Sequence, residues 1–121
     1  MSNLCMYGMT VEGNINDIKK LASYMKGEQP YKLAGVQTDD TYFGNHDGTH
    51  VINGGCRNTV ELSMLGTAFS YYHRAKDKSS ITTLEQLTKK LDLKVEIIGS
   101  GEINEKFIIN RGVIEYEIEA E

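Results

Sequence analysis

The side chains in this sequence that could bind a metal or transfer a proton are concentrated near its middle. His46 and His50 flank an Asp-Gly pair, a strong turn dipeptide, so a turn could direct both imidazoles towards one ion. Cys56 or Asp39 would then supply a third ligand. Zinc sites need three or four protein ligands, and none of these spacings is diagnostic of one. The sequence favours exposed loop histidines, and we assign no metal site.

A second candidate is the segment Gly54-Gly55-Cys56-Arg57. Paired glycines let backbone amides approach an anion, and Arg57 could bind a phosphate through two hydrogen bonds. A reactive cysteine needs a neighbouring cation that lowers its pKa. Adjacent residues of a strand point to opposite faces, however, so Arg57 would not lie over the Cys56 thiol. We therefore predict a bulge at Asn53–Gly55 and a buried Cys56. No residue is assigned as catalytic, and Arg57 is kept as a binding residue.

The third candidate lies within Leu65–Lys76, which is predicted to be a helix. The apolar residues of this helix have helical spacing and would face the core: Leu65, Ala68, Phe69 and Tyr72. Tyr71, His73 and Arg74 would then have a more exposed position. Aromatic rings beside an arginine can stack on a base or form the centre of a protein interface. An ordinary amphipathic helix with a polar rim is the alternative. The predicted binding residues are Arg57, Tyr71, His73 and Arg74.

Known catalytic motifs are missing from the sequence. It contains no phosphate-binding Gly-rich loop, zinc-protease helix motif or nucleophile elbow. Carboxylates are plentiful, but no pair is marked by its spacing as a general acid and base. The sequence thus favours a non-enzymatic role and predicts no cofactor. A small hydrolase or nuclease that uses a metal or Cys56 is the alternative.

Two amphipathic helices should flank the central region. Asn14 can cap the first, with Asp17 as a capping-box partner, and Gly27 can end it. Its apolar face consists of Ile15, Ile18, Leu21, Ala22 and Met25. Thr82 and Glu85 have capping-box spacing at the start of the other helix. The apolar stripe of that helix consists of Leu84, Leu87 and Leu91.

The remaining segments are predicted to be strands. Strands are expected at 1–13 and 33–37, on either side of the turn at 45–48, at 60–64 and at 93–97, followed by a hairpin that turns at 110–112. In the last strand Ile114, Tyr116 and Ile118 alternate with glutamates, which predicts one apolar and one acidic face. The order of elements predicts a single α+β domain covering 1–121. The best fit is a ferredoxin-like antiparallel sheet with helices packed on one face, an extra central helix and a C-terminal hairpin.

Composition limits the classes of partner. The chain has 121 residues, a formal charge of −4 and a pI near 5.4, so duplex nucleic acid is not an expected partner. No run of about 18 apolar residues and no secretory signal is present, and we expect no membrane association. The two cysteines are expected to be reduced. These features predict a cytoplasmic protein.

Three patterns together suggest a family. The first is Asn3, Cys5, Met9-Thr10-Val11 and Gly13, and the second is the segment 54–60, GGCRNTV. The third consists of residues 91–96 (LDLKVE), Gly101, residues 105–109 (EKFII) and Gly112. In this order they resemble the YubB-like ferredoxin-like family, small proteins carried mostly by phages and plasmids. The chain departs from the family pattern at Leu4, where members commonly carry Trp. The resemblance implies the fold and an origin in a mobile element, and it implies no catalytic residue.

These observations give three hypotheses for function. The first is a phage- or plasmid-encoded binding protein that counters a host defence of the CRISPR type or a signalling defence. It would block a host defence protein or hold a small phosphate-bearing ligand such as a nucleotide. The second is the small hydrolase described above. The third is a structural or housekeeping protein of the mobile element. A homodimer is also expected, since an added C-terminal hairpin would leave an exposed sheet edge.

Overall fold

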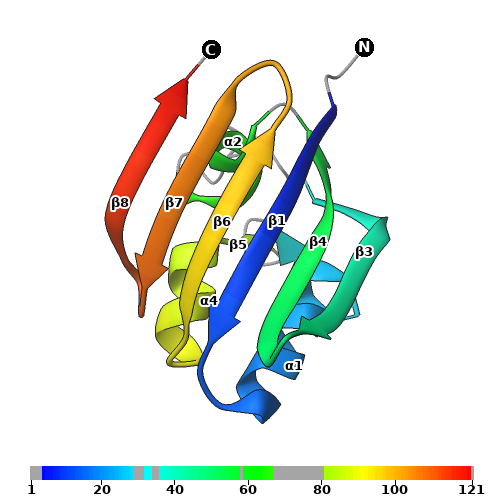
Figure 1. Cartoon of the computed structure of the whole chain (residues 1–121), viewed down its shortest axis with the longest axis vertical. Coiled ribbons are helices and arrows are strands. Elements are labelled where there is room, and N and C mark those ends of the chain that lie inside the picture. Colours follow the sequence, from blue (N-terminus) through cyan, green and yellow to red (C-terminus); the bar gives the residue numbers. More distant parts are fainter. Residues whose placement is uncertain (1–3, 29–31, 34–35, 58, 67–80, 121) are drawn as a thin grey trace.

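A mostly antiparallel six-stranded sheet with a few helices makes this an α+β structure (Figure 1). The computed structural model describes residues 4–28, 32–33, 36–57, 59–66 and 81–120. The strand order in the sheet is β3-β4-β1-β6-β7-β8. The bounds are β1 Leu4–Glu12, β3 Val36–His46, β4 Thr49–Arg57, β6 Lys94–Ser100, β7 Asn104–Asn110 and β8 Val113–Ala120. Two short strands, β2 (Lys32–Leu33) and β5 (Ile81–Thr82), pair in parallel outside this sheet.

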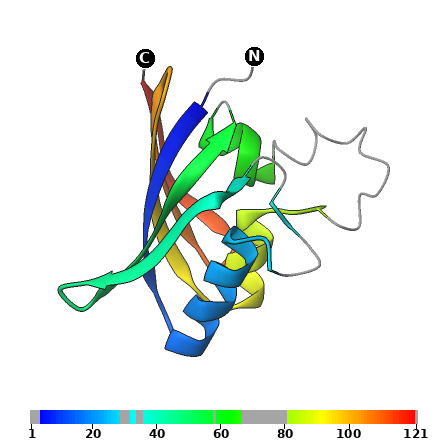
Figure 2. The same ribbon diagram turned by 90° about the vertical axis from the view of Figure 1, so that its right-hand side faces the viewer.

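The described helices all lie on one face of the six-stranded sheet (Figure 2). They are α1 (Ile15–Met25), α2 (Val60–Met64) and α4 (Leu84–Lys90). No described helix is long and apolar enough to cross a membrane. The opposite face of the sheet carries no helix among the described residues, and this asymmetry determines which side chains meet solvent.

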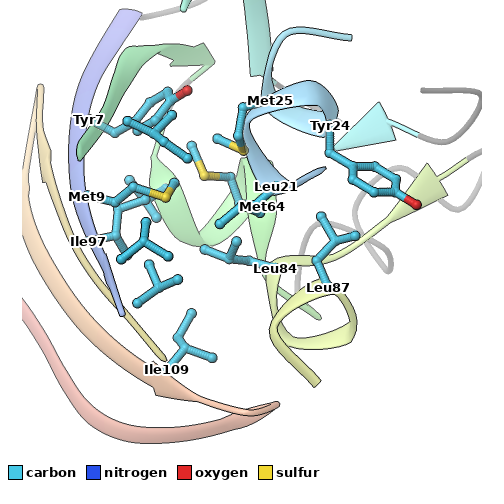
Figure 3. Close-up of a cluster of buried hydrophobic side chains, with 14 of the residues drawn as sticks. Tyr7, Met9, Leu21, Tyr24, Met25, Met64, Leu84, Leu87, Ile97 and Ile109 are labelled. Atoms are coloured by element: carbon cyan, nitrogen blue, oxygen red, sulfur yellow. The ribbon is translucent and has the colours of Figure 1, made fainter. Parts of the chain in front are cut away.

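Strand alternation builds the core between the sheet and the helices (Figure 3). In β1 every second residue is buried, and β6 and β7 follow the same rule. These side chains meet the apolar faces of α1 and α4, among them Leu21, Met25, Leu84 and Leu87. The largest fully buried side chain is Phe107 of β7.

The predicted start of the first helix is confirmed. The Asn14 side chain accepts a hydrogen bond from the Asn16 amide at 2.9 Å, and α1 begins at the next residue. Gly27 has a φ of 75° directly after the last turn, as expected of a glycine that ends a helix. The predicted turn at 45–48 is also present, because Asp47 and Gly48 both have positive φ between β3 and β4.

The predicted start of α4 was wrong by one residue. Thr83, not Thr82, is the N-cap, and its hydroxyl accepts from the Gln86 amide at 3.3 Å. The Gln86 side chain accepts in return from the Thr83 amide at 3.1 Å, which completes the capping box without Glu85. Thr82 instead donates to Gln86 Oε1 at 3.1 Å.

Two other local predictions were wrong. Residues 60–64 form helix α2 instead of a strand, because Thr59 caps it through the Leu62 amide at 3.1 Å. The irregularity predicted at Asn53–Gly55 was assigned to the wrong strand. The register between β3 and β4 does shift there, because Gly55 pairs with Gln37 and Asn53 with Tyr42, but the extra residues are in β3 and β4 is continuous. Of the helix predicted at Leu65–Lys76, Leu65 has an extended backbone and belongs to the end of α2. The part from residue 67 onward lies outside the described residues.

Strand β8 does not have one apolar and one acidic face along its whole length. The register against β7 shifts between Ile108 and Ile109, so Tyr116 lies opposite Ile108 while Ile114 lies opposite Ile109. Since neighbouring residues of β7 point to opposite faces, Ile114 and Tyr116 do as well. Glu115 is the extra residue at this bulge.

Candidate protein-binding surface

The structure places one of the four predicted binding residues. Arg57 is exposed at the end of β4, opposite Leu4 of β1, while its neighbour Cys56 is buried. Alternation along β4 puts the Arg57 position on the uncovered face of the sheet, so Arg57 does not lie over the thiol, as predicted. Tyr71, His73 and Arg74 lie outside the described residues.

Cys56 is directly opposite Cys5 of β1, and both thiols are free and fully buried. The hydrogen bond to Cys5 and the loss of solvent raise the pKa of the Cys56 thiol. Nucleophilic cysteines need a lowered pKa and access to solvent. Because both thiols are fully buried, this pair packs the core, in agreement with the prediction of a buried Cys56.

Glu105 is a buried residue that sequence reasoning missed. It is 1 % exposed, and its Oε2 and Oε1 accept from the Val60 and Glu61 amides at 2.8 and 3.1 Å. These are amide groups that the start of a helix cannot satisfy itself. The carboxyl group thus ties α2 to β7, and its role is positional.

The histidines do not converge with Cys56. His46 and His50 lie at the far end of the β3–β4 pair, where His50 stacks with Phe43 at a centroid distance of 6.3 Å. Six residues of strand separate His50 from Cys56, a distance of roughly 20 Å at about 3.3 Å per residue. Within the described part of the chain, no three His, Cys, Asp or Glu side chains are close enough to hold a metal ion.

Large apolar side chains are exposed on the face of the sheet that no described helix covers. Met6 of β1 and Ile98 of β6 are 50 % and 51 % exposed. Tyr116 and Ile118 of β8 are 40 % and 46 % exposed, and half-buried Ile108 lies opposite Tyr116. We call Met6, Ile98, Ile108, Tyr116 and Ile118 the open-face patch. It spans four strands, with Lys106 between Ile98 and Ile118 in the register, and exposed apolar patches of this kind mark interaction sites.

A shallow hollow of about 430 Å³ lies within this face, with Gly8 in its lining. Gly8 has no side chain to fill it, and the Asn53 side chain leans over the glycine from β4, with Oδ1 only 3.1 Å from where a Cβ would be. The face is lined by Met6, Gly8, Thr10, Val51, Asn53, Ile98 and Ser100. No lysine or arginine lines it, so the hollow suits an apolar side chain better than a phosphate.

Lys106 organises the polar part of the same face. Its Nζ lies 3.3 Å from Glu96 Oε1 and 5.5 Å from the centre of the Tyr116 ring. The lysine thus fixes the ring of one patch residue and neutralises the neighbouring carboxylate. Partly buried polar groups that are already paired add specificity to an apolar surface at little desolvation cost.

A second hollow, between α1 and α4, contains two lysines that are already engaged. Lys20 Nζ is 3.9 Å from Asp17, and Lys90 Nζ donates to the Tyr24 hydroxyl at 3.4 Å. A phosphate would have to compete with these contacts. The described residues therefore favour the sheet face over this groove as a binding surface.

No family model, curated protein or solved structure matches this chain.

Proposed function

We propose that this chain is a small non-enzymatic binding protein that blocks another protein with the uncovered face of its sheet. The observation that carries the proposal is the open-face patch, where four large apolar residues remain 40–51 % exposed. Burying such side chains on a partner contributes about 25 cal/mol for each Å² removed from water.

The size of the face supports a protein partner. Six strands about 4.8 Å apart and 7–11 residues long, at about 3.3 Å per residue, cover roughly 800 Å². A standard interface buries about 800 Å² on each partner. The version of the hypothesis in which the chain holds a phosphate-bearing ligand has less support, because the hollow at Gly8 is lined by no basic residue.

We further propose a ferredoxin-like arrangement and a counter-defence role in a phage or plasmid. The arrangement is supported by the order β3-β4-β1-β6 with antiparallel neighbours, to which β7 and β8 add at one edge. The biological role is supported by the family resemblance and by a blocking surface that needs no catalytic group. The partner would be a host defence protein with an apolar surface of its own.

The test is a pair of charge substitutions. Ile98→Glu introduces a carboxylate into the patch beside Lys106, which lies opposite it in β7. Ile15→Glu changes an isoleucine that is 39 % exposed on α1, on the helix side. Proteins captured from a bacterial lysate by the unchanged chain would be identified by mass spectrometry, purified and titrated by calorimetry.

We expect Ile98→Glu to weaken binding by about tenfold or more, since it buries a charge at the interface. Ile15→Glu should leave the affinity within about twofold, because surface changes outside an interface are nearly neutral. Equal affinities for the two variants, both folded by circular dichroism, would refute the sheet face as the binding surface. Self-association as the sole interaction would instead support a structural role.

A further inference from the structure

Strand β8 forms one edge of the sheet, pairing with β7 and with no other described strand. An edge strand presents unpaired backbone N–H and C=O groups that can template another strand. Proteins protect such edges with charges and bulges, and β8 has both. Glu115 and Glu117 are exposed, and Glu115 is the bulge residue.

From Tyr116 to Ile118 the register of β8 against β7 is unbroken, and the two faces of the strand carry different side chains. Tyr116 and Ile118 lie opposite Ile108 and Lys106 and belong to the open-face patch. Glu117 lies opposite Phe107, so its side chain is on the helix side of the sheet. Among the described residues Glu117 makes no ion pair, and Glu115 accepts one hydrogen bond, from Asn110 Nδ2 at 3.3 Å. The edge thus has an apolar side and an unneutralised acidic side.

We infer that β8 accepts an extended segment of another protein in which basic residues alternate with apolar ones. The incoming strand would continue the sheet beyond β8, as in other cases of strand addition. Its apolar residues would lie beside Tyr116 and Ile118, and its lysines or arginines would lie on the helix side beside Glu117. The inference rests on the proposed function, because Tyr116 and Ile118 belong to both the open-face patch and the β8 edge. It adds that the partner segment is basic and apolar in alternation.

Charge argues against a second copy of this chain as the occupant. Residues directly opposite in an antiparallel pair point to the same face. Two copies joined at β8 with their helices on the same side would therefore pair helix-side residues with helix-side residues. In the register centred on Glu117, this glutamate would face its own copy. Like charges directly opposite are destabilising, whereas opposite charges stabilise the pair.

The experiment uses the full chain and a synthetic peptide of alternating lysine and valine. A peptide of the same composition with its lysines grouped together is the control for nonspecific attraction, and an alternating glutamate–valine peptide is the control for charge. Affinity would be measured by fluorescence titration at low and high salt. Amide hydrogen exchange would show which strand is covered.

We expect the alternating lysine peptide to bind and to slow exchange along β8, more weakly at high salt because screening reduces the attraction. Glu115→Lys with Glu117→Lys should weaken this peptide by about tenfold and favour the glutamate peptide. N-methylation of alternate peptide amides should abolish binding to the unchanged protein, because it removes backbone donors without altering the protein.

Three results would overturn the inference: equal binding of the grouped-lysine peptide, protection at β3 instead of β8, or binding that survives both charge reversal and N-methylation. The peptide experiment and the test of the proposed function can fail independently of each other. Ile98→Glu should impair the protein partner without affecting the peptide. If only the inference fails, the peptide gives one of these three results while Ile98→Glu still weakens binding of the protein partner.

Discussion

The carboxyl group of Glu105 offers a direct test of how α2 is held on the sheet. Its two oxygens accept from the Val60 and Glu61 amides at 2.8 and 3.1 Å in a site that is 1 % exposed. Glu105→Gln keeps the volume of the side chain but replaces one acceptor oxygen with an NH₂ donor. One helix amide then faces a donor and remains buried without a partner.

A buried donor without an acceptor costs about 1–3 kcal/mol, so we expect Glu105→Gln to lower the free energy of unfolding by about 2 kcal/mol. For a chain of 121 residues this corresponds to a decrease in Tm of roughly 8 °C. The assay is urea and thermal unfolding followed by circular dichroism. Amide exchange at Val60 and Glu61 should accelerate as well, because the substitution acts on those two groups.

Glu96→Gln is the matched control, since it removes a carboxylate whose side chain is 44 % exposed and paired with Lys106. Exposed pairs contribute about 0–1 kcal/mol, so this variant should stay close to the unchanged protein. If Glu105→Gln were as stable as Glu96→Gln, the two hydrogen bonds could not be what fixes α2. The helix would then have to be held by the burial of Val60 and Met64.

Two further predictions concern the core. Gly99→Ala would place a Cβ 2.6 Å from Val60 Cγ2 and 2.9 Å from Glu105 Oε2, so we expect a loss of about 2–3 kcal/mol in urea unfolding. Gly8→Ala meets only the Asn53 side chain, at 3.1 Å for its nearest atom, and should cost less; equal losses would show that the core at Gly99 can relax. Burial raises the pKa of Tyr7 above its usual value near 10, so the folded state keeps a proton that the unfolded chain releases. Stability from this group is therefore complete below about pH 10 and falls above it by up to about 1.4 kcal/mol per pH unit. Tyr7→Phe should therefore reduce the decline of the unfolding free energy with rising pH by up to about 1.4 kcal/mol per pH unit. An unchanged slope in melts at about pH 10–11.5 would contradict the assignment.

Local patterns predicted those elements whose signals lie within a few residues. Asn14 and the apolar residues of α1 follow one another at intervals of four or fewer positions, so the cap and most of the buried face could be predicted from the sequence. The exceptions are Ile15, which is 39 % exposed, and Tyr24, which is buried. The neighbouring threonines 82 and 83 each have a suitable partner three residues later, and no local rule chooses between them. The choice is made by which threonine hydroxyl reaches an amide of the helix.

Long-range contacts explain what could not be predicted. Val60, Leu62 and Met64 alternate like a strand, but two groups stabilise the start of the helix that they form. One is the local cap Thr59, and the other is Glu105, which comes 45 residues after Val60. Alternation puts Glu105 on the same face of β7 as Phe107 and Ile109, but no residue nearby indicates which amides its carboxylate binds. The open-face patch was missed for a related reason. Strands β1 and β6 have apolar residues on both faces, and only the placement of the helices decides which face stays exposed.

The central position of β1 also affects how the chain folds during synthesis. β1 is made before its two partners, and it pairs with β4 on one side and with β6 on the other. About 90 residues separate the end of β1 from the end of β6, so at roughly 5–20 residues per second the second partner arrives about 5–20 s later. For that interval a strand containing Met6, Tyr7 and Met9 has an unpaired edge. The nascent chain is then open to chaperones and to pairing with its neighbours on a polysome, so slower translation should lower the yield of folded protein.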